Sequence, residues 1–150
     1  MYANILLSTD GSDVARNGVK HGMALAKALN AKVTVITVTE ALPVDLGSGH
    51  ASGWMPLQAE IDSFDAASKE RAGKALDEAR AMAEQIGISA EFLHVPNAHP
   101  ATAIIEAAKY RGCDLIVMGS HGRRGLRKLL LGSQTSEVLA DGSVPVLVVR

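Results

Sequence analysis

The residues best suited to binding chemistry gather between positions 119 and 133. Glycine recurs at Gly119, Gly122 and Gly125, and Gly132-Ser133 follows just before a predicted helix. Glycine lets backbone N–H groups approach an anion without a Cβ in the way, and a helix start adds unpaired donors at the positive end of its dipole. Basic side chains share the segment: Arg123, Arg124, Arg127 and Lys128. The segment therefore suits phosphate; the alternative is turn glycines beside a solvated basic face.

A second candidate for ligand contact is Asp10, which follows the apolar run 4–8. A carboxylate at this point can accept hydrogen bonds from ribose hydroxyls or cap the helix that follows, and both alternatives stay open. The standard phosphate motifs do not occur: the chain has no G-x-x-x-x-G-K-[ST], and no G-x-G-x-x-G follows its first apolar run.

Arrangements for metal binding or nucleophilic catalysis find no support in the sequence. The five histidines show no close paired spacing such as H-x-x-x-H, and the single cysteine, Cys113, provides no cluster. No G-x-S-x-G elbow marks a catalytic serine. We therefore predict no protein-built metal site and no catalytic residue. His121 lies inside the glycine segment and is expected to be a loop or interface contact rather than a catalytic base.

These residues must be positioned by an alternation of strands and helices. Apolar runs rich in branched residues predict strands at 4–8, 33–38, 89–95, 115–118 and 145–149. All but 89–95 are nearly continuously apolar, which is typical of strands covered on both faces. Helical spacing fills the intervals: a helix capped by Ser12 or Asp13 and reaching Leu29, a longer one ended by Gly87, one from Pro100 to Gly112, and a short one opened by Ser133.

The alternation predicts an α/β fold, an open five-stranded parallel sheet with helices on both faces, Rossmann-like in architecture. In such a sheet, ligands bind beyond the carboxyl ends of the strands. Asp10, Thr39 and Gly119 each follow a predicted strand, so we expect them at one edge. The long connection 40–60, which holds Trp54, is expected to flank a binding site; the alternative is a surface excursion or partner contact.

Length and charge bound the remaining possibilities. The 150 residues predict a single domain over 1–150. A net charge of −1 excludes a generally basic nucleic-acid binder, and the basic cluster lacks aromatic neighbours for stacking. No basic flank precedes the first apolar run, so we expect no signal peptide. No apolar stretch approaches the roughly 20 residues that a membrane span needs. With one cysteine, a cytoplasmic protein without membrane contact is expected.

Together these segments resemble the ATP-binding universal stress proteins, the UspA-like family. Gly119-x2-Gly122-x9-Gly132-Ser133 reproduces the nucleotide-binding signature G-x2-G-x9-G-[ST] of that group. The opening I-L-L-S-T-D-G-S, the run D-L-I-V-M-G-S-H-G-R and the terminal V-P-V-L-V-V match it too, so the resemblance covers the whole chain. It implies the strand order 3-2-1-4-5, which puts the loop after the first strand beside the loop after the fourth.

The resemblance also implies roles for single residues. Asp10 would contact the nucleoside, the backbone at Val38 would meet adenine, and Met118 would lie where the loop begins against ribose and phosphates. The later glycines and the first helical residues would hold the phosphates. With their loop neighbours, the predicted nucleotide-binding residues are Thr9, Asp10, Val38, Met118, Gly119, His121, Gly122, Arg123, Gly132, Ser133, Gln134 and Thr135.

The function implied is that of a regulatory ATP-binding protein of the stress response, with Mg²⁺ on the phosphates and ADP or AMP as other occupants. Hydrolysis is expected to be slow at most, because no Walker lysine is present. The resemblance implies a homodimer through the last strand, Pro145 to Val149, which no later element covers. The alternative is a partner-binding stress dimer that works without nucleotide. An adenylyl-transferring enzyme and a flavodoxin-like FMN carrier are disfavoured, the latter by an aromatic content of 3%.

Overall fold

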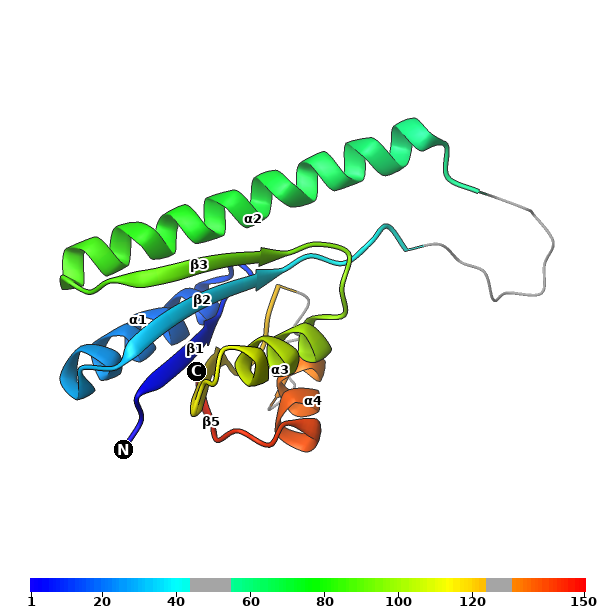
Figure 1. Cartoon of the computed structure of the whole chain (residues 1–150). Helices are drawn as coiled ribbons and strands as arrows, with labels where there is room; N and C mark the ends of the chain where they lie inside the picture. The colour runs from blue at the N-terminus through cyan, green and yellow to red at the C-terminus, as the bar shows by residue number, and fades with distance from the viewer. Residues whose placement is uncertain (44–54, 124–130) are drawn as a thin grey trace.

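The computed structural model describes residues 1–43, 55–123 and 131–150. Strands and helices alternate along this part of the chain (Figure 1). Their bounds are β1 Asn4–Ser8, α1 Asp13–Leu29, β2 Lys32–Val38, α2 Gln58–Ile86, β3 Ala90–Val95, α3 Pro100–Tyr110, β4 Leu115–Gly119, α4 Ser133–Asp141 and β5 Val146–Val149. Trp54 in the predicted long connection, and Arg124, Gly125, Arg127 and Lys128 of the glycine segment, lie outside the described residues.

The strands form one parallel sheet in the order β3-β2-β1-β4-β5. β1 lies at its centre, where Leu6 is opposite Thr34 of β2 on one side and Ile116 of β4 on the other. The chain therefore builds the sheet first toward β3 and then, from β4 onward, in the other direction. The predicted α/β class, the parallel sheet and the strand order are all confirmed.

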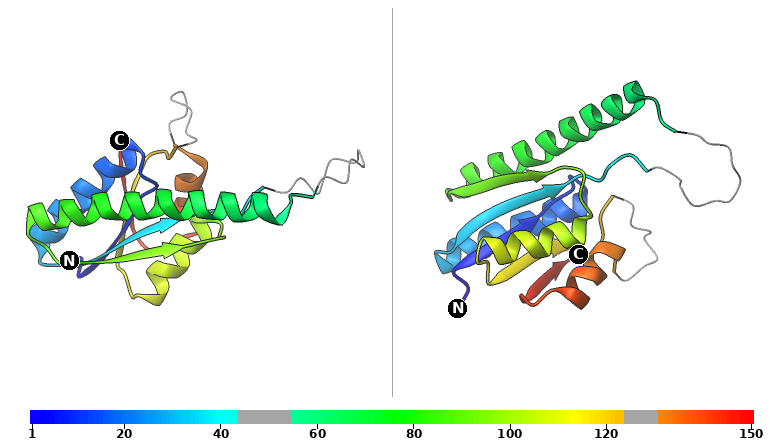
Figure 2. Two further views of the ribbon diagram at one scale, coloured as in Figure 1. Left: turned by 90° about the horizontal axis from the view of Figure 1, so that it is seen from above. Right: turned by 45° about the vertical axis from the view of Figure 1, so that its right-hand side comes forward.

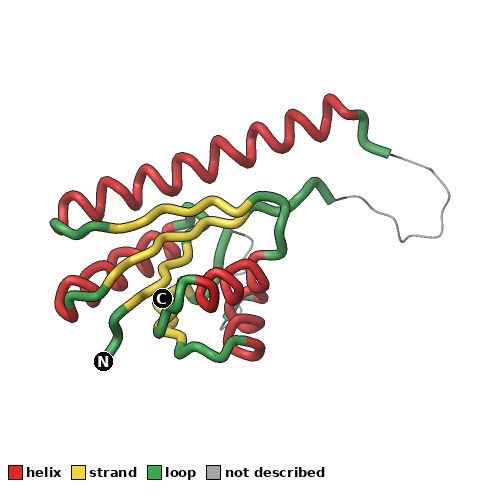
Figure 3. The backbone as a smooth tube through the Cα atoms, in the orientation of Figure 1, coloured by secondary structure: helices red, strands yellow, loops and turns green. Residues whose placement is uncertain are grey.

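Helices cover both faces of the sheet, as predicted (Figures 1 and 3). α1 and α2 pack on the face to which β1 turns Ile5 and Leu7, whereas α3 and α4 pack on the face of Leu6. Strand side chains alternate between the two faces, so a strand buried on both of them must be apolar nearly throughout. The three β1 side chains have no exposed surface.

Capping residues decide where the first two helices begin and end. Ser12 is the N-cap of α1, since its hydroxyl accepts a hydrogen bond from the Ala15 N–H at 3.2 Å. Of the two predicted caps Ser12 is thus correct, and Asp13 is the first helical residue. α2 ends at Gly87, which takes the left-handed conformation at φ 76° that glycine adopts without strain.

The last strand is less covered than its composition predicts. Its apolar run favours burial on both faces, yet Leu147 is 39% exposed. β5 lies at the edge of the sheet, where Val149 packs into the core with residues of α1 but Leu147 does not belong to that cluster. The expectation of full cover is therefore wrong for β5, an edge strand whose only buried residue is Val149.

Among the described residues, no helix has both the length and the apolar character that crossing a membrane requires. α2 spans 29 residues, but acidic and basic side chains recur along it.

Candidate functional site

A cavity of about 570 Å³ opens at the carboxyl ends of β1, β2 and β4. Its volume falls in the range of small-molecule sites, roughly 300–1,000 Å³. It also lies where the strand order reverses, the place at which open α/β sheets bind ligands. The structure brings all the predicted site residues together in its lining: Thr9, Asp10, Val38, Met118, Gly119, His121, Gly122, Arg123, Gly132, Ser133, Gln134 and Thr135.

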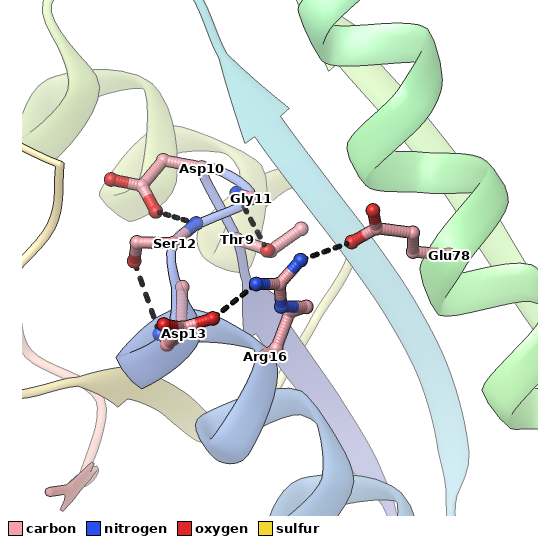
Figure 4. Close-up of polar contacts among 8 residues, drawn as sticks. Thr9, Asp10, Gly11, Ser12, Asp13, Arg16 and Glu78 are labelled. Atoms are coloured by element: carbon pink, nitrogen blue, oxygen red, sulfur yellow. Dashed lines mark hydrogen bonds and ion pairs between the residues drawn. The ribbon is translucent and has the colours of Figure 1, made fainter.

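Asp10 connects the loop after β1 to the loop after β4. One carboxylate oxygen accepts a hydrogen bond from the Ser12 N–H at 3.0 Å, which forms a tight turn just before α1 (Figure 4). The other oxygen accepts a hydrogen bond from the Arg123 N–H at 2.7 Å. Asp10 is therefore not the N-cap of α1, and that alternative is wrong, because Ser12 holds the N-cap position. Each carboxylate oxygen keeps a second lone pair with which it can accept a further donor.

An ion pair joins the start of α1, directly after the β1 loop, to α2. Arg16 in the first turn of α1 forms ion pairs with Asp13 and with Glu78 of α2, the latter at 3.1 Å (Figure 4). The Arg16 guanidinium thus ties α1 to α2 beside the cavity. Both carboxylates raise the pKa of Arg16 through hydrogen bonds, that of Asp13 first.

Two glycines of the signature stand where a side chain has no room. A Cβ at Gly122 would lie 2.4 Å from the Asp10 carboxylate oxygen, and one at Gly132 would lie 3.0 Å from the Cα of His121. The Gly132 N–H donates to the Ser120 carbonyl at 2.7 Å, which closes the loop on itself. Together they form a cradle of backbone that a ligand can approach closely.

The start of α4 is open to a ligand. Gly132 is its N-cap and provides no side-chain capping bond, in contrast to Ser12 at the start of α1. The first three residues of the helix, Ser133, Gln134 and Thr135, line the cavity. A helix start combines free N–H donors with the positive end of the dipole, so this one suits an anion.

The side chains of Gln134 and Thr135 brace the site rather than point free into it. Thr135 is 2% exposed, and its hydroxyl donates to the Gly119 carbonyl at 2.9 Å. The Gln134 side-chain oxygen accepts a hydrogen bond from the Ala101 N–H in the first turn of α3 at 2.9 Å. What these two residues leave for a ligand is chiefly their backbone N–H groups.

β2 forms the opposite end of the cavity with Val38 and Thr39. The Thr39 hydroxyl is hydrogen-bonded to His94 of β3 at 2.8 Å, and its N–H donates to the Val95 carbonyl at 3.0 Å. Burial of His94, and then the nearby Lys69, lower the pKa of this histidine, which favours its neutral ring. Hydrogen bonds from Thr39 to the His94 ring and to the Val95 carbonyl thus hold the β2 end of the cavity against β3.

α2 and α3 add cavity residues that the sequence analysis did not identify. Those of α2 are Phe64, Ser68, Arg71 and Ala72, and those of α3 are Pro100 and Ile104. In the sequence, Ser68 and Arg71 come just before the buried alanines at 72, 75, 79 and 83, and nothing local marks them as ligand contacts. Only the fold shows that this part of α2 lies beside the ends of the strands.

The donor set fits a phosphorylated ligand better than a metal held by the protein alone. Within residues 1–43, 55–123 and 131–150, no three histidine, cysteine, aspartate or glutamate side chains gather as metal ligands would. The cradle and the open α4 start instead offer backbone N–H groups, and a basic residue, Arg123, is among the residues that line the cavity.

Comparison with known proteins decides the family. The sequence model that describes the universal stress protein family matches residues 1–150 of this chain. The chain belongs to the universal stress protein family. Within it, universal stress protein MJ0531 of Methanocaldococcus jannaschii is 34% identical over 150 residues, which cover 100% of this chain and 83% of that relative. YxiE of Bacillus subtilis is 32% identical, with 100% of both chains covered.

Solved structures of universal stress proteins share the fold. MJ0577 of Methanocaldococcus jannaschii superposes with a TM-score of 0.82 at 28% identity, over 99% of this chain and 96% of that one. A universal stress protein solved in complex with cAMP superposes with a TM-score of 0.70, also at 28% identity, over 99% and 97% of the two chains.

Proposed function

We propose that this universal stress protein binds an adenine nucleotide, ATP with Mg²⁺, and acts as a regulatory protein in a stress response. The observation that carries the proposal is that the glycine cradle and the uncapped start of α4 line one cavity. Both supply backbone N–H donors to a phosphate chain. The relative that was solved with cAMP supports an adenine nucleotide as the ligand.

Each end of the cavity has its own part in this proposal. The N–H groups of Gly122 and Ser133 would hold the phosphates, and Gly132, whose own N–H donates to Ser120, would give them room to approach; Mg²⁺ would arrive with them. The Val38 backbone would contact adenine. The Asp10 carboxylate would accept a hydrogen bond from a ribose hydroxyl, on a lone pair that the Ser12 and Arg123 N–H groups leave free. ADP or AMP would occupy the same site with fewer phosphate contacts.

We assign no catalytic residue and expect ATP hydrolysis to be slow at most. The sequence has no Walker lysine to follow the transferred phosphoryl group. Backbone donors hold phosphates in the ground state, and binding alone does not accelerate their transfer. A regulatory role needs only that the occupied and the empty protein differ in what they contact.

We also propose that the protein is a homodimer through β5. Within the described residues, β5 pairs only with β4 and its other edge meets no strand. Apolar side chains along that edge favour pairing with a second copy. The dimer would present two nucleotide sites.

The first test is to purify the protein without added nucleotide, denature it by heat and chromatograph what is released. Near-stoichiometric adenine nucleotide supports the site, and the ratio of ATP to ADP shows whether turnover occurs. If nothing is released, MgATP is titrated into the protein by calorimetry. No binding in that titration would contradict the proposal and favour a partner-binding dimer that works without nucleotide.

A further inference from the structure

The inward stripe of α2 changes character along the helix. Over the sheet its buried residues are Ala75, Ala79 and Ala83, and larger apolar side chains of α2 pack against the same core beside them. The N-terminal part of α2 continues past the carboxyl ends of β2 and β3 (Figures 1 and 2). There the cavity is lined by buried Ser68, half-buried Phe64 and the more exposed Arg71. Helix-on-sheet packing explains the alanines, but it does not require a phenylalanine and an arginine beyond the sheet.

Arg71 differs from Arg16, Arg80 and Arg111 in what it contacts. Arg16 and Arg111 form ion pairs with carboxylates, and Arg80 lies 4.2 Å from the centre of the Phe92 ring. The Arg71 guanidinium donates to the Ser68 hydroxyl at 3.1 Å, and no carboxylate pairs with it among the described residues. Ser68 is 4% exposed, so it anchors the guanidinium from inside.

The position of α2 decides which part of a ligand it would meet. α2 contacts β2, β3 and α1, whereas α4 contacts α3 and β5. The α2 residues therefore stand at the β2 end of the cavity, with Val38 and Thr39, and away from the open start of α4. In the proposed function this is the nucleoside end. A phenyl ring and a guanidinium share a flat face, and both stack on nucleobases.

We infer that Phe64 and Arg71 of α2 form an outer wall against which the nucleobase packs, with Ser68 holding the guanidinium in place. The inference rests on the proposed nucleotide site and adds a third element to it, besides the loops after β1 and β4. It makes Phe64 and Arg71 binding residues for the base and assigns them no contact with the phosphates.

The test is a calorimetric titration of ATP, ADP, AMP and adenosine into wild type, Arg71→Ala, Arg71→Lys and Phe64→Leu. Stacking on a base predicts that Arg71→Ala weakens all four ligands alike, by roughly five- to hundredfold. Arg71→Lys keeps the charge without the flat face, so it is expected to remain weak. Phe64→Leu keeps apolar bulk without the ring and is expected to weaken all four as well.

The matched control is Lys74→Ala, which removes one positive charge from the exposed side of the same helix, outside the cavity. Its affinities should stay within about twofold of wild type, because exposed charges are screened by salt. A loss confined to ATP, full binding by Arg71→Lys, or wild-type binding by Arg71→Ala would each overturn the inference. If wild type itself binds none of the four ligands, the proposed function fails first.

Discussion

The Asp10 carboxylate occupies the space that a side chain at residue 122 would need. A Cβ there would lie 2.4 Å from an oxygen that also accepts the Arg123 N–H. Gly122→Ala therefore pushes Asp10 aside and breaks the link between the loops after β1 and β4. We expect MgATP affinity to fall by about tenfold or more, as a lost hydrogen bond to a charged group costs about 1.5–3 kcal/mol. Calorimetric titration measures this.

Gly73→Ala is the matched control for that substitution. A Cβ at Gly73 meets nothing within 4 Å, and the residue lies in the interior of α2. Its MgATP affinity should equal that of wild type, and its stability should rise slightly because alanine favours a helix over glycine. Unchanged binding by Gly122→Ala would contradict the role of the Asp10 bridge in the site.

At the scale of elements, a side chain of α4 caps the N-terminus of α3. His99, the N-cap of α3, makes no side-chain capping bond, and the Gln134 oxygen of α4 accepts the Ala101 N–H instead. Gln134→Ala should lower the free energy of unfolding by about 1 kcal/mol, the usual cost of a lost cap. Gln134→Glu keeps the acceptor and should retain stability. Urea denaturation compares them, and equal stability of Gln134→Ala and wild type would disprove the cap.

Most element bounds could be predicted because local signals set them. Ser12 caps α1, Gly87 ends α2, and the apolar run of β1 matches a strand buried on both faces. Contacts between distant elements left no such signal. The Asp10 bond to Arg123 spans two loops, and the place of Arg71 at the cavity depends on where α2 crosses the sheet. Propensity and spacing describe a segment by itself, so tertiary contacts of this kind escape them.

For the whole molecule, the backbone of β5 determines how a second copy could pair. The carbonyls of Pro145 and Val149 accept hydrogen bonds from Ile116 and Ser120 beside β4. Backbone groups alternate sides along a strand, so Val146 and Val148 turn theirs toward the outer edge. A two-fold axis would set this edge antiparallel to its own copy, since a two-fold interface uses the same surface on both subunits.

Val148→Pro tests this dimer directly, because proline removes an outward N–H without touching the bonds to β4. We expect wild type to sediment at twice the chain mass of 15.7 kDa and Val148→Pro to sediment at the chain mass itself. Leu147→Pro is the matched variant: its N–H faces β4, so it should lower the melting temperature instead. A Val148→Pro protein that stays dimeric would show that the dimer forms through another surface. A wild type that is monomeric at micromolar concentration would contradict the proposed dimer. Retention of MgATP binding by the Val148→Pro monomer would further show that each site is complete within one chain.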